Sequence, residues 1–265
     1  MTFPERTSYG RFTVYSYGPP VEPSLLLGEM LKGRTIPDKG RGGISVISLN
    51  GITMACRQYI HGGLFRAITQ DRFFSERRAL NEADILRYLS ENNFPVVRPC
   101  FVVAEKKGFT KRLFLITEFI PGASDLLDIW RTASRMRRFR IIKRLAGLVR
   151  RLELLGVFHP DLHINNILVT GKGELVLLDF DRAFKKATGI NDMERIFWRL
   201  DRYMEKYAGK GMIAPDMKEK TFFLRAYQRL AGYDILSSME EQQRTKSVRN
   251  RIGWSIESFF YGGKR

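Results

Sequence analysis

One segment constrains the fold of this chain more than any other: "VFHPDLHINNILVTGKGELVLLDFDRAF", residues 157–184. Within it, the apolar runs "NILV" and "ELVLL" flank the turn-forming residues "TGKG", and this pattern predicts a β-hairpin. Both faces of the second run are apolar, so the hairpin is expected to be buried. A buried hairpin holds its ends rigidly, and polar side chains at such an end should occupy fixed positions.

Three oxygen-bearing side chains are predicted to converge at one end of this hairpin. If Val169 pairs with Glu174, Asp179 emerges at the same end as Asn166, and Asp161 lies in the loop that leads into the first strand. Asn and Asp oxygens suit Mg²⁺, which shares its coordination with substrate phosphates. A further Asp nearby can orient an alcohol and accept its proton. The alternative is that these groups only cap turns and strand ends.

A second hairpin is predicted at Asn50-Gly51, because a type I′ turn needs positive φ at both central positions. The turn implies a register with these facing pairs: Leu49 with Ile52, Ile47 with Met54, Val46 with Ala55, and Ile44 with Arg57. Arg57 then lies at the end of the hairpin that carries Gly40, Gly42 and Gly43. Glycine N–H groups beside a cation can bind phosphate oxygens, and a plain turn is the alternative.

Apolar spacing and turn residues predict the other elements. Residues 75–91 should form a helix that carries Glu82, which either pairs with Arg57 as part of a site or forms only a surface ion pair. Strands follow over residues 94–122 and end at the linker-like Pro121-Gly122. Helices then dominate, at 135–155, 193–207, 218–231 and 238–260. The chain is therefore predicted to be α+β, with a small β-rich N-terminal lobe (1–120) and a larger helical C-terminal lobe (121–265).

The ends of two helices carry further signals. The apolar stripe of the helix over 135–155 is predicted to begin at Met136, and Gly156 is well placed to end that helix. Residues 191–194 resemble a capped helix start. Residues 1–38 are rich in turn residues and weakly periodic, so no element is assigned there.

Charge and cysteine content narrow the class of protein. The chain has 45 Lys and Arg against 28 Asp and Glu, a net charge of +17, and such a field attracts nucleic acid, nucleotides, anionic membranes or acidic sugars. Cys56 and Cys100 form no CxxC pair, which argues against zinc. Two cysteines cannot staple a chain of this size, which indicates a reducing compartment. The first residues lack a signal-peptide core and no apolar run is long enough to span a bilayer. We therefore expect a cytoplasmic protein, soluble or peripheral to a membrane.

The order of these features resembles the protein-kinase-like superfamily. "HPDLHINN" matches H-x-D-x-x-x-x-N, and "LDFD" stands where those enzymes carry the metal-binding D-F-G segment. The glycine turn, the strand cation and the helix glutamate precede these motifs in the same order. The resemblance implies a bilobal kinase-like fold and phosphoryl transfer.

A narrower resemblance covers most of the chain. "GRGG", "RQYIHGGLF", "FPVVRP" and "GVFHPDLHINNIL…LLDFDRA" are similar to the lipopolysaccharide-core kinases, especially the 3-deoxy-D-manno-octulosonic acid (Kdo) kinases. That family uses ATP to phosphorylate a sugar of lipid A–inner-core lipopolysaccharide on the cytoplasmic face of the inner membrane. The resemblance implies ATP and Mg²⁺ as cofactors and the 4-hydroxyl of Kdo as acceptor. It also implies a lipid-linked acidic sugar and an anionic membrane surface as partners, rather than nucleic acid.

The resemblance also implies a role for each matching residue. The resemblance implies that Asp161 is the catalytic base and that Asn166 and Asp179 are the Mg²⁺ ligands. It also implies that the nucleotide phosphates are covered by Gly40, Gly42 and Gly43. Arg57 would be the strand cation, and Glu82 its partner on the helix. His159 is expected to be a structural hydrogen-bonding residue rather than a catalyst.

The sequence departs from the protein-kinase pattern in several places. Arg57 stands where protein kinases use Lys, the glycine loop is shortened, and Asp181 replaces the glycine of D-F-G. Asp181 is either an extra metal-facing or substrate-facing carboxylate or the ion-pair partner of Arg182 or another base. The absence of an A-P-E segment argues against a protein substrate. The alternatives are a heptose kinase of the same core, an atypical protein kinase, an antibiotic phosphotransferase, or a kinase-fold binding protein without catalysis.

The run "RTASRMRRFRIIKRLAGLVRR" contains nine Lys or Arg and no acid. It is predicted to be either a solvated helix face or a contact for anionic lipid and the acidic groups of lipid A and Kdo. These two interpretations carry equal weight from the sequence.

Overall fold

The computed structural model describes residues 4–36, 44–61, 71–209 and 215–240. These residues form helices and mainly antiparallel sheets, so the chain is α+β as predicted. The chain divides into two compact units: Met1–Ile129 with Leu155–Lys186, and Trp130–Leu154 with Ala187–Arg265. The lobe boundary near residue 120 stays a prediction. The predicted phosphate-covering residues Gly40, Gly42 and Gly43 lie outside the described residues.

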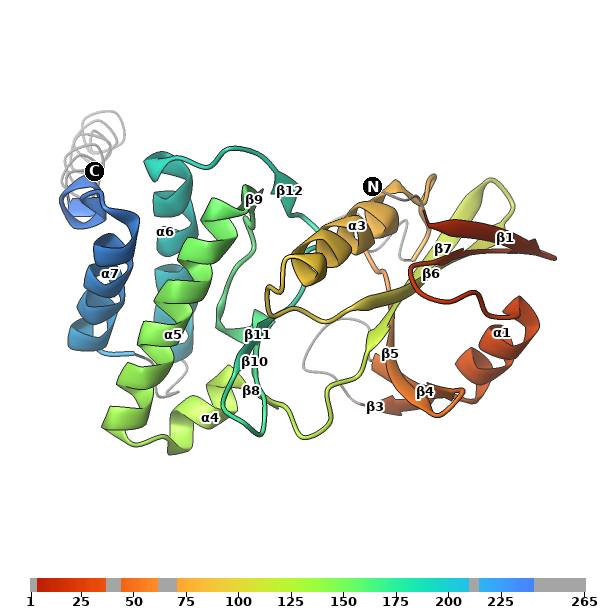
Figure 1. Cartoon of the computed structure of the whole chain (residues 1–265), viewed down its shortest axis with the longest axis horizontal. Helices are drawn as coiled ribbons and strands as arrows, with labels where there is room; N and C mark the ends of the chain where they lie inside the picture. Colours follow the sequence, from red (N-terminus) through yellow and green to blue (C-terminus); the bar gives the residue numbers. More distant parts are fainter. Residues whose placement is uncertain (1–3, 37–43, 62–70, 210–214, 241–265) are drawn as a thin grey trace, which may run out of the picture. The chain divides into compact units, whose positions relative to one another are not determined.

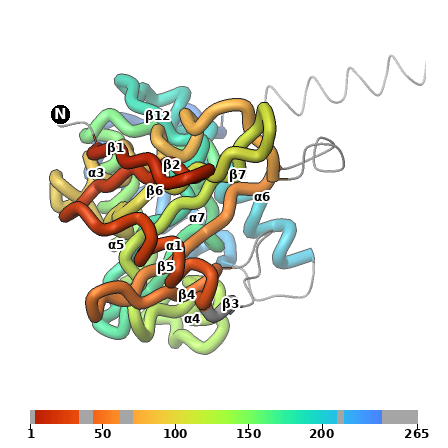
Figure 2. Tube along the Cα trace, turned by 90° about the vertical axis from the view of Figure 1, so that its right-hand side faces the viewer, coloured from red at the N-terminus to blue at the C-terminus, as the bar shows by residue number. Residues whose placement is uncertain are grey.

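The first unit is built on a seven-stranded antiparallel sheet with the strand order β1-β2-β6-β7-β5-β4-β3. Figures 1 and 2 show its strands side by side. The strands are β1 Glu5–Tyr9, β2 Phe12–Ser16, β3 Arg34–Ile36, β4 Ile44–Leu49, β5 Ile52–Gln58, β6 Pro99–Lys107 and β7 Thr110–Glu118. Three of these strands and the helix α1 (Pro23–Lys32) lie within residues 1–38, where the sequence pattern supported no assignment.

The turn between β4 and β5 is the predicted Asn50-Gly51 turn. Its two central residues have φ values of 51° and 77°, and every predicted pair from Leu49 with Ile52 to Ile44 with Arg57 is present. β5 also pairs with β7 on its other side, so Arg57 faces Leu115 as well. Two hydrogen-bonded neighbours leave β5 no freedom to slip, and this fixes the face on which Arg57 points.

The two faces of the sheet receive different helices. A buried cluster on one face joins Leu26 of α1 to Met54 and Cys56 of β5. Because successive side chains of a strand alternate between faces, Arg57 points to the other face. The helix α3 (Arg77–Glu91) contacts β6 and β7 and buries the predicted stripe of Ala79, Ala83, Leu86 and Leu89. Glu82 is buried on the same helix, 2% exposed.

The predicted buried hairpin is present, but the predicted register is wrong by one residue. β10 (Ile167–Val169) pairs with β11 (Leu175–Leu177) so that Val169 faces Leu175 instead of Glu174. The turn takes in one more residue because Gly173 adopts a φ of 76° and the Thr170 hydroxyl accepts the N–H of Glu174 at 3.1 Å. The three residues of β11 are buried, as both apolar faces predicted.

Short elements complete the first unit around this hairpin. β8 (Ser124–Asp125) pairs with β10, and β9 (Val157–Phe158) pairs with β12 (Phe184–Lys185). A single 3₁₀ turn, η1 (Ile164–Asn166), leads into β10. Gly156, which was predicted to end a helix, has a φ of 64° immediately before β9. The segment that carries the predicted site is therefore anchored at both of its ends.

The second unit is helical. α5 (Arg135–Leu154) packs against α7 (Met217–Ala231), with the rings of Phe139 and Phe222 4.8 Å apart, and α6 (Ile190–Ala208) lies between them in sequence. The short helix α4 (Leu126–Thr132) precedes α5. Glu153 of α5 accepts hydrogen bonds from two tyrosines of this unit, Tyr227 and Tyr233.

Two predictions about these helices are wrong in detail. Met136 is 66% exposed, because a helix advances about 100° per residue and Met136 lies far from the buried Ile142, Val149 and Leu152. α6 begins at Ile190 after Gly189 rather than at residues 191–194, and the Asp192 carboxylate accepts the N–H of Gly189 at 3.3 Å. Most of the helix predicted at 238–260 lies outside the described residues.

Candidate active site

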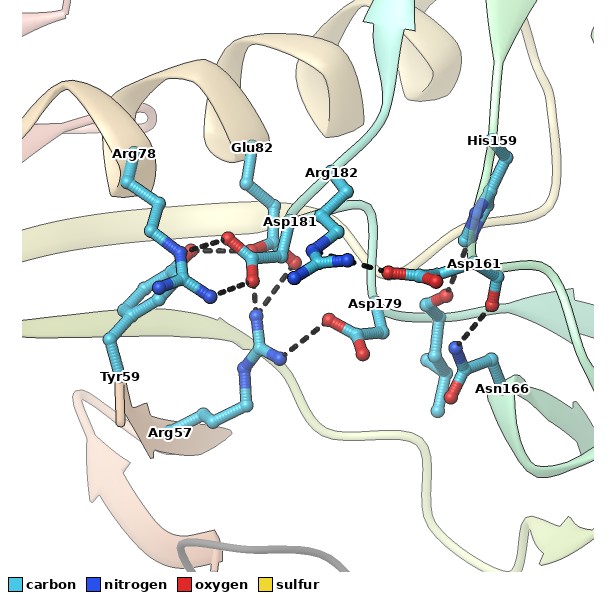
Figure 3. A network of polar contacts seen from close by, with 11 residues as sticks. Arg57, Tyr59, Arg78, Glu82, His159, Asp161, Asn166, Asp179, Asp181 and Arg182 are labelled. Carbon is cyan, nitrogen blue, oxygen red and sulfur yellow. Dashed lines mark hydrogen bonds and ion pairs between the residues drawn. The ribbon is translucent and has the colours of Figure 1, made fainter. Parts of the chain in front are cut away.

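The strand cation binds two carboxylates at once. Arg57 donates from Nη2 to both oxygens of Glu82, at 2.7 and 2.6 Å, and from Nη1 to Asp179 at 2.9 Å. Figure 3 shows the guanidinium of Arg57 between these two groups. The predicted pairing of Arg57 with Glu82 is therefore present, and it includes the predicted metal ligand Asp179.

A second arginine, which lies on α3, also binds a carboxylate of the site, and the sequence did not predict this contact. Arg78 donates from Nε to Asp181 Oδ1 at 2.5 Å and from Nη2 to Asp181 Oδ2 (Figure 3). Arg78 precedes Glu82 by four residues, so both side chains lie on one face of the helix. Asp181 pairs with this base rather than with its neighbour Arg182. The i, i+4 spacing indicates that Arg78 lies on the same helix face as Glu82, but it does not identify Asp181 as the partner of Arg78.

Tyr59 was also missed, although it follows Arg57 by two residues. It lies directly after β5, and its N–H donates to the carbonyl of Leu113 at 2.9 Å, so the alternation of the strand places it on the same side as Arg57. Its hydroxyl donates to Glu82, and the guanidinium groups of Arg57 and Arg78 lie 5.0 and 5.6 Å from its ring centre. Tyr59 thus contacts both arginines and limits where Glu82 can move. Arg57 and Tyr59 together hold this carboxylate in place.

The loop before β10 carries Asp161 and Asn166. Asn166 is 8% exposed, and its Nδ2 donates to the backbone carbonyl of Asp161 at 3.1 Å. This hydrogen bond leaves the amide oxygen of Asn166 as the atom that can bind a metal. The N–H of Leu178 donates to the carbonyl of Asn166 at 2.8 Å, so the start of β10 is tied to the end of β11. Asp179 therefore emerges beside Asn166 despite the shifted register.

His159 stabilises this loop through buried contacts. It is fully buried, its Nε2 lies 3.2 Å from the carbonyl oxygen of Leu178, and its ring packs 4.6 Å from that of Phe180. Burial lowers the pKa of His159, so the neutral imidazole is favoured. These contacts match the structural role that was expected for His159.

Asp179 occupies a special backbone position. It has a φ of 60°, in the left-handed region that non-glycine residues adopt rarely and at a cost of roughly 1–3 kcal/mol. The neighbouring side chains make up for this strain, since Arg57 holds its carboxylate and Asp181 is held by Arg78. The side chain of Asp179 is still 40% exposed, so it remains open to a ligand.

The pKa values of the cluster follow from burial and its arginines. Burial raises the pKa of Glu82 to about 7, and the positive charge of Arg57 opposes that rise. Burial also pushes the pKa of Asp179 upward, but the charge and hydrogen bond of Arg57 outweigh it and hold this pKa below its usual range. The carboxylate of Asp179 is therefore ionised at neutral pH.

The fourth carboxylate of the site has a cation of its own. The Nε of Arg182 lies 3.5 Å from Asp161 Oδ2, and the Arg182 side chain is 68% exposed (Figure 3). The cluster thus contains three guanidinium groups, from Arg57, Arg78 and Arg182, and four carboxylates, from Glu82, Asp161, Asp179 and Asp181. The carboxylates outnumber the guanidinium groups by one, and Glu82, with a pKa of about 7, is partly protonated at neutral pH.

The donor set fits a magnesium ion that is shared with a substrate. Asn166 and Asp179 offer hard oxygen ligands side by side, and the ionised carboxylate of Asp179 favours a cation. Within the part of the chain that the structure describes, no group of three or more His, Cys, Asp or Glu side chains could hold a metal alone. Asn166 and Asp179 would supply two ligands, and Mg²⁺ would complete its coordination with water and phosphate oxygens.

The chain is similar to known proteins over most of its length. The family model described as "Lipopolysaccharide kinase (Kdo/WaaP) family" matches residues 30–227. A 3-deoxy-D-manno-octulosonic acid kinase of Stenotrophomonas maltophilia is 30% identical over 200 residues, which cover 74% of this chain and 79% of that protein. The proteins of the same name from Vibrio vulnificus (31% over 152 residues, 56% and 64% covered) and Xanthomonas oryzae (27% over 201 residues, 74% and 80% covered) also match.

The family match spans the site as well as the fold. The matched residues include Arg57, Glu82, Asp161, Asn166 and Asp179, all of which lie within 30–227. The roles of these individual residues stay predictions, because the match concerns the chain as a whole. The kinase family and its named relatives make this chain a phosphotransferase that acts on a hydroxyl group. On the match over residues 30–227, the chain belongs to the lipopolysaccharide kinase (Kdo/WaaP) family.

Proposed function

We propose that this chain transfers a phosphoryl group from ATP to the 4-hydroxyl of Kdo in lipid A–inner-core lipopolysaccharide. The observation that carries the proposal is the grouping of Asp161, Asn166 and Asp179 at the end of one buried hairpin, opposite the Arg57–Glu82 pair. The relatives named as 3-deoxy-D-manno-octulosonic acid kinases support Kdo as the acceptor.

Each residue of the site has a defined task in this proposal. Asp161 accepts a hydrogen bond from the acceptor hydroxyl and takes up its proton as the new oxygen–phosphorus bond forms. Arg57 donates to the phosphates of ATP while Glu82 fixes the direction of its guanidinium. Asn166 and Asp179 hold Mg²⁺, which neutralises phosphate charge when it is bound. Catalysis then consists mainly of positioning and charge stabilisation.

Transfer to Kdo–lipid A tests the proposal directly. The protein is incubated with Mg-ATP and purified Kdo–lipid A, and the product is analysed by mass spectrometry with fragmentation of the sugar. We expect the mass of one phosphate on Kdo, at the 4-position. Phosphate on a heptose of a longer core acceptor would reassign the substrate, and no phosphate on any core sugar would reject the proposal.

The role of Asp161 has its own test. Asp161→Ala and Asp161→Asn should lower kcat by roughly 100-fold or more, because general base catalysis contributes about 10²–10⁴-fold. ATP binding should persist, since the phosphate contacts are assigned to other residues. Glu29→Gln on α1, where the carboxylate is 26% exposed and pairs with Lys32, is a carboxylate control outside the site that should leave kcat unchanged. Equal activity of wild type and both Asp161 variants would remove Asp161 from its assigned role.

A kinase-fold binding protein without catalysis is the alternative of a different class. Mg-ATP should raise the melting temperature of an ATP-dependent kinase, because a ligand that binds only the native state stabilises it. A stability gain of about 2.7 kcal/mol is expected at 100 times the dissociation constant. Absence of any shift together with absence of transfer would favour the binding protein.

We also propose that the chain acts at an anionic membrane surface on the cytoplasmic face of the inner membrane. The support is the exposed side of the basic run, which includes the side chains of Arg135, Arg137, Arg140, Lys143, Arg144 and Arg151. Arg138 and Arg150 of the same run instead face Glu219 and Glu153 within the second unit. Among the helices that the structure describes, none is both long and apolar enough to cross a bilayer.

Vesicle sedimentation tests the membrane proposal. The test vesicles contain roughly 30 mol% phosphatidylglycerol, an anionic lipid. Pure phosphatidylcholine vesicles are the control. Binding to the anionic vesicles alone, weakened at high salt, is expected, since each cation near such a surface contributes about 1 kcal/mol. Equal binding to both vesicle types, or to neither, would overturn the proposed surface.

A further inference from the structure

Two adjacent residues after the metal-binding position face different partners. Asp181 is 14% exposed and is held by Arg78 of α3, whereas Arg182 is 68% exposed and contacts Asp161 (Figure 3). The Arg78–Asp181 pair anchors the backbone of this segment to the helix. Because Arg182 is the next residue, the same ion pair fixes the position of its backbone. Arg182 is thereby placed beside the predicted catalytic base.

The contact between Arg182 and Asp161 contributes little to the fold. Its Nε–Oδ2 distance of 3.5 Å is long, and its arginine is 68% exposed although Asp161 is only 19% exposed. Because water screens the charge of Arg182, the pair is worth about 0–1 kcal/mol. The other two arginines of the cluster are less exposed, at 31% for Arg57 and 33% for Arg78, and each makes hydrogen bonds to carboxylates at 2.9 Å or less. Arg182 is therefore the guanidinium of the cluster that a ligand can reach most easily.

We propose that Arg182 binds the carboxylate of the acceptor sugar. This inference rests on the proposed function, in which Asp161 is the base and the acceptor is an acidic sugar. The reacting hydroxyl must come within hydrogen-bond reach of the Asp161 carboxylate. A guanidinium that already lies 3.5 Å from this carboxylate then lies next to the same sugar ring. The planar fork of arginine matches a carboxylate with two parallel N–H donors.

Charge explains why a cation is needed at this position. An acidic acceptor that approaches Asp161 brings a second carboxylate close to the first, and like charges repel. Arg182 lies where it neutralises Asp161 in the free protein and can share its donors with the acceptor carboxylate in the complex. An acceptor without a carboxylate lacks this attraction, so Arg182 favours acidic over neutral sugars.

The competing explanation is that Arg182 only orients Asp161. In that case its loss should harm every acceptor equally, because the effect passes through the base. If Arg182 binds the acceptor carboxylate, the loss should depend on whether the acceptor has one. This difference can be measured by varying the protein and the acceptor together.

The experiment crosses two proteins with two acceptors. Wild type and Arg182→Met are assayed with Kdo–lipid A and with its carboxyl methyl ester, and kcat and KM are measured for each acceptor. For wild type, esterification should lower kcat/KM roughly 10- to 100-fold, because a charge-assisted contact is lost. For Arg182→Met, the acid and the ester should be used almost equally. Arg182→Lys should retain part of the preference, and the KM for ATP should not change.

A matched control removes a positive charge elsewhere. Arg6→Met loses an exposed arginine of β1, outside both the site and the basic run, and should affect both acceptors by the same factor. Equal losses on acid and ester in Arg182→Met would assign Arg182 to orienting Asp161 and overturn the proposal. A wild-type protein that does not distinguish the two acceptors would also overturn it.

A binding measurement separates failure of this inference from failure of the proposed function. Calorimetric titration of wild type and Arg182→Met with the acid and with the ester requires no phosphoryl transfer. If wild type transfers no phosphate but binds the acid more tightly than the ester, and Arg182→Met loses that preference, the function fails and the binding site stands. If neither protein prefers the acid, the binding site is rejected whether or not transfer occurs.

Discussion

The connection between α3 and the segment that carries the proposed Mg²⁺ ligand Asp179 can be tested by removing either half of the Arg78–Asp181 ion pair. Arg78→Met, Asp181→Asn and the double variant form a cycle in which the double variant lacks the pair altogether. We expect each single variant to lose both stability and activity, and the double variant to lose less than the sum. The reason is that each single variant leaves one charged group with its partner gone.

The size of the effect follows from the geometry of the pair. Two unit charges about 4 Å apart interact with about 4 kcal/mol at an effective dielectric constant of 20, and desolvation offsets much of that. The side chains are 33% and 14% exposed and share two hydrogen bonds, so a coupling free energy of about 1–2 kcal/mol is expected. If all of this energy helps to place Asp179, its loss lowers kcat by about 5- to 30-fold.

Two measurements on the same proteins decide the outcome. Urea unfolding gives the coupling free energy of unfolding, and steady-state kinetics at varied Mg²⁺ gives kcat and the Mg²⁺ concentration at half-maximal rate. The exposed Glu29–Lys32 pair of α1 is the control cycle, and its coupling should be only about 0.2–0.5 kcal/mol. Additive effects within about 0.5 kcal/mol for Arg78 and Asp181, with kcat and Mg²⁺ dependence unchanged, would refute the reasoning.

Two further predictions concern the hairpin turn and the cysteines. Gly173→Ala should destabilise by about 1–2 kcal/mol because its φ is 76°, whereas Gly171→Ala in the same turn should change the unfolding free energy by less than about 0.5 kcal/mol; equal effects in urea titrations would contradict the turn geometry. Burial raises the pKa of Cys56 to about 12 and that of Cys100 to about 11, so both thiols stay protonated at pH 8. They should react slowly with a disulfide reagent until pH rises toward those values or guanidinium unfolds the chain, and native labelling at the rate of a free thiol would contradict this.

The elements that the sequence predicted best are those set by local chemistry. The Asn50-Gly51 turn has few backbone conformations available, so it determined the register that brings Arg57 beside Ile44. The second hairpin was predicted to exist but not in its correct register, because Gly173 takes the turn one residue further. The convergence of Asn166 and Asp179 survived this error, since both lie at the same end of the hairpin in either register.

The contacts that sequence reasoning missed are those between distant segments. Tyr59 and Arg78 carried only spacing signals, two residues after Arg57 and four residues before Glu82. Arg78 and Asp181 are 103 residues apart, and no local pattern shows which acid an arginine on a helix will meet. Met136 was assigned to the apolar stripe from a spacing of three or four residues. Such a spacing identifies neighbours on one helix face, but over several turns the direction of the side chains drifts away from that face.

The sequence by itself determined the class of fold, the two hairpins, the main helices and the set of oxygen-bearing residues, because turn chemistry and apolar periodicity act over a few residues. Apart from the predicted Arg57–Glu82 pair, only the tertiary structure decided which charges pair. It joined Arg57 to Asp179 as well, paired Asp181 with Arg78, and left Arg182 exposed beside Asp161. Ion pairs depend on where side chains meet after the sheet and α3 have packed, and that placement is a property of the whole unit rather than of any segment.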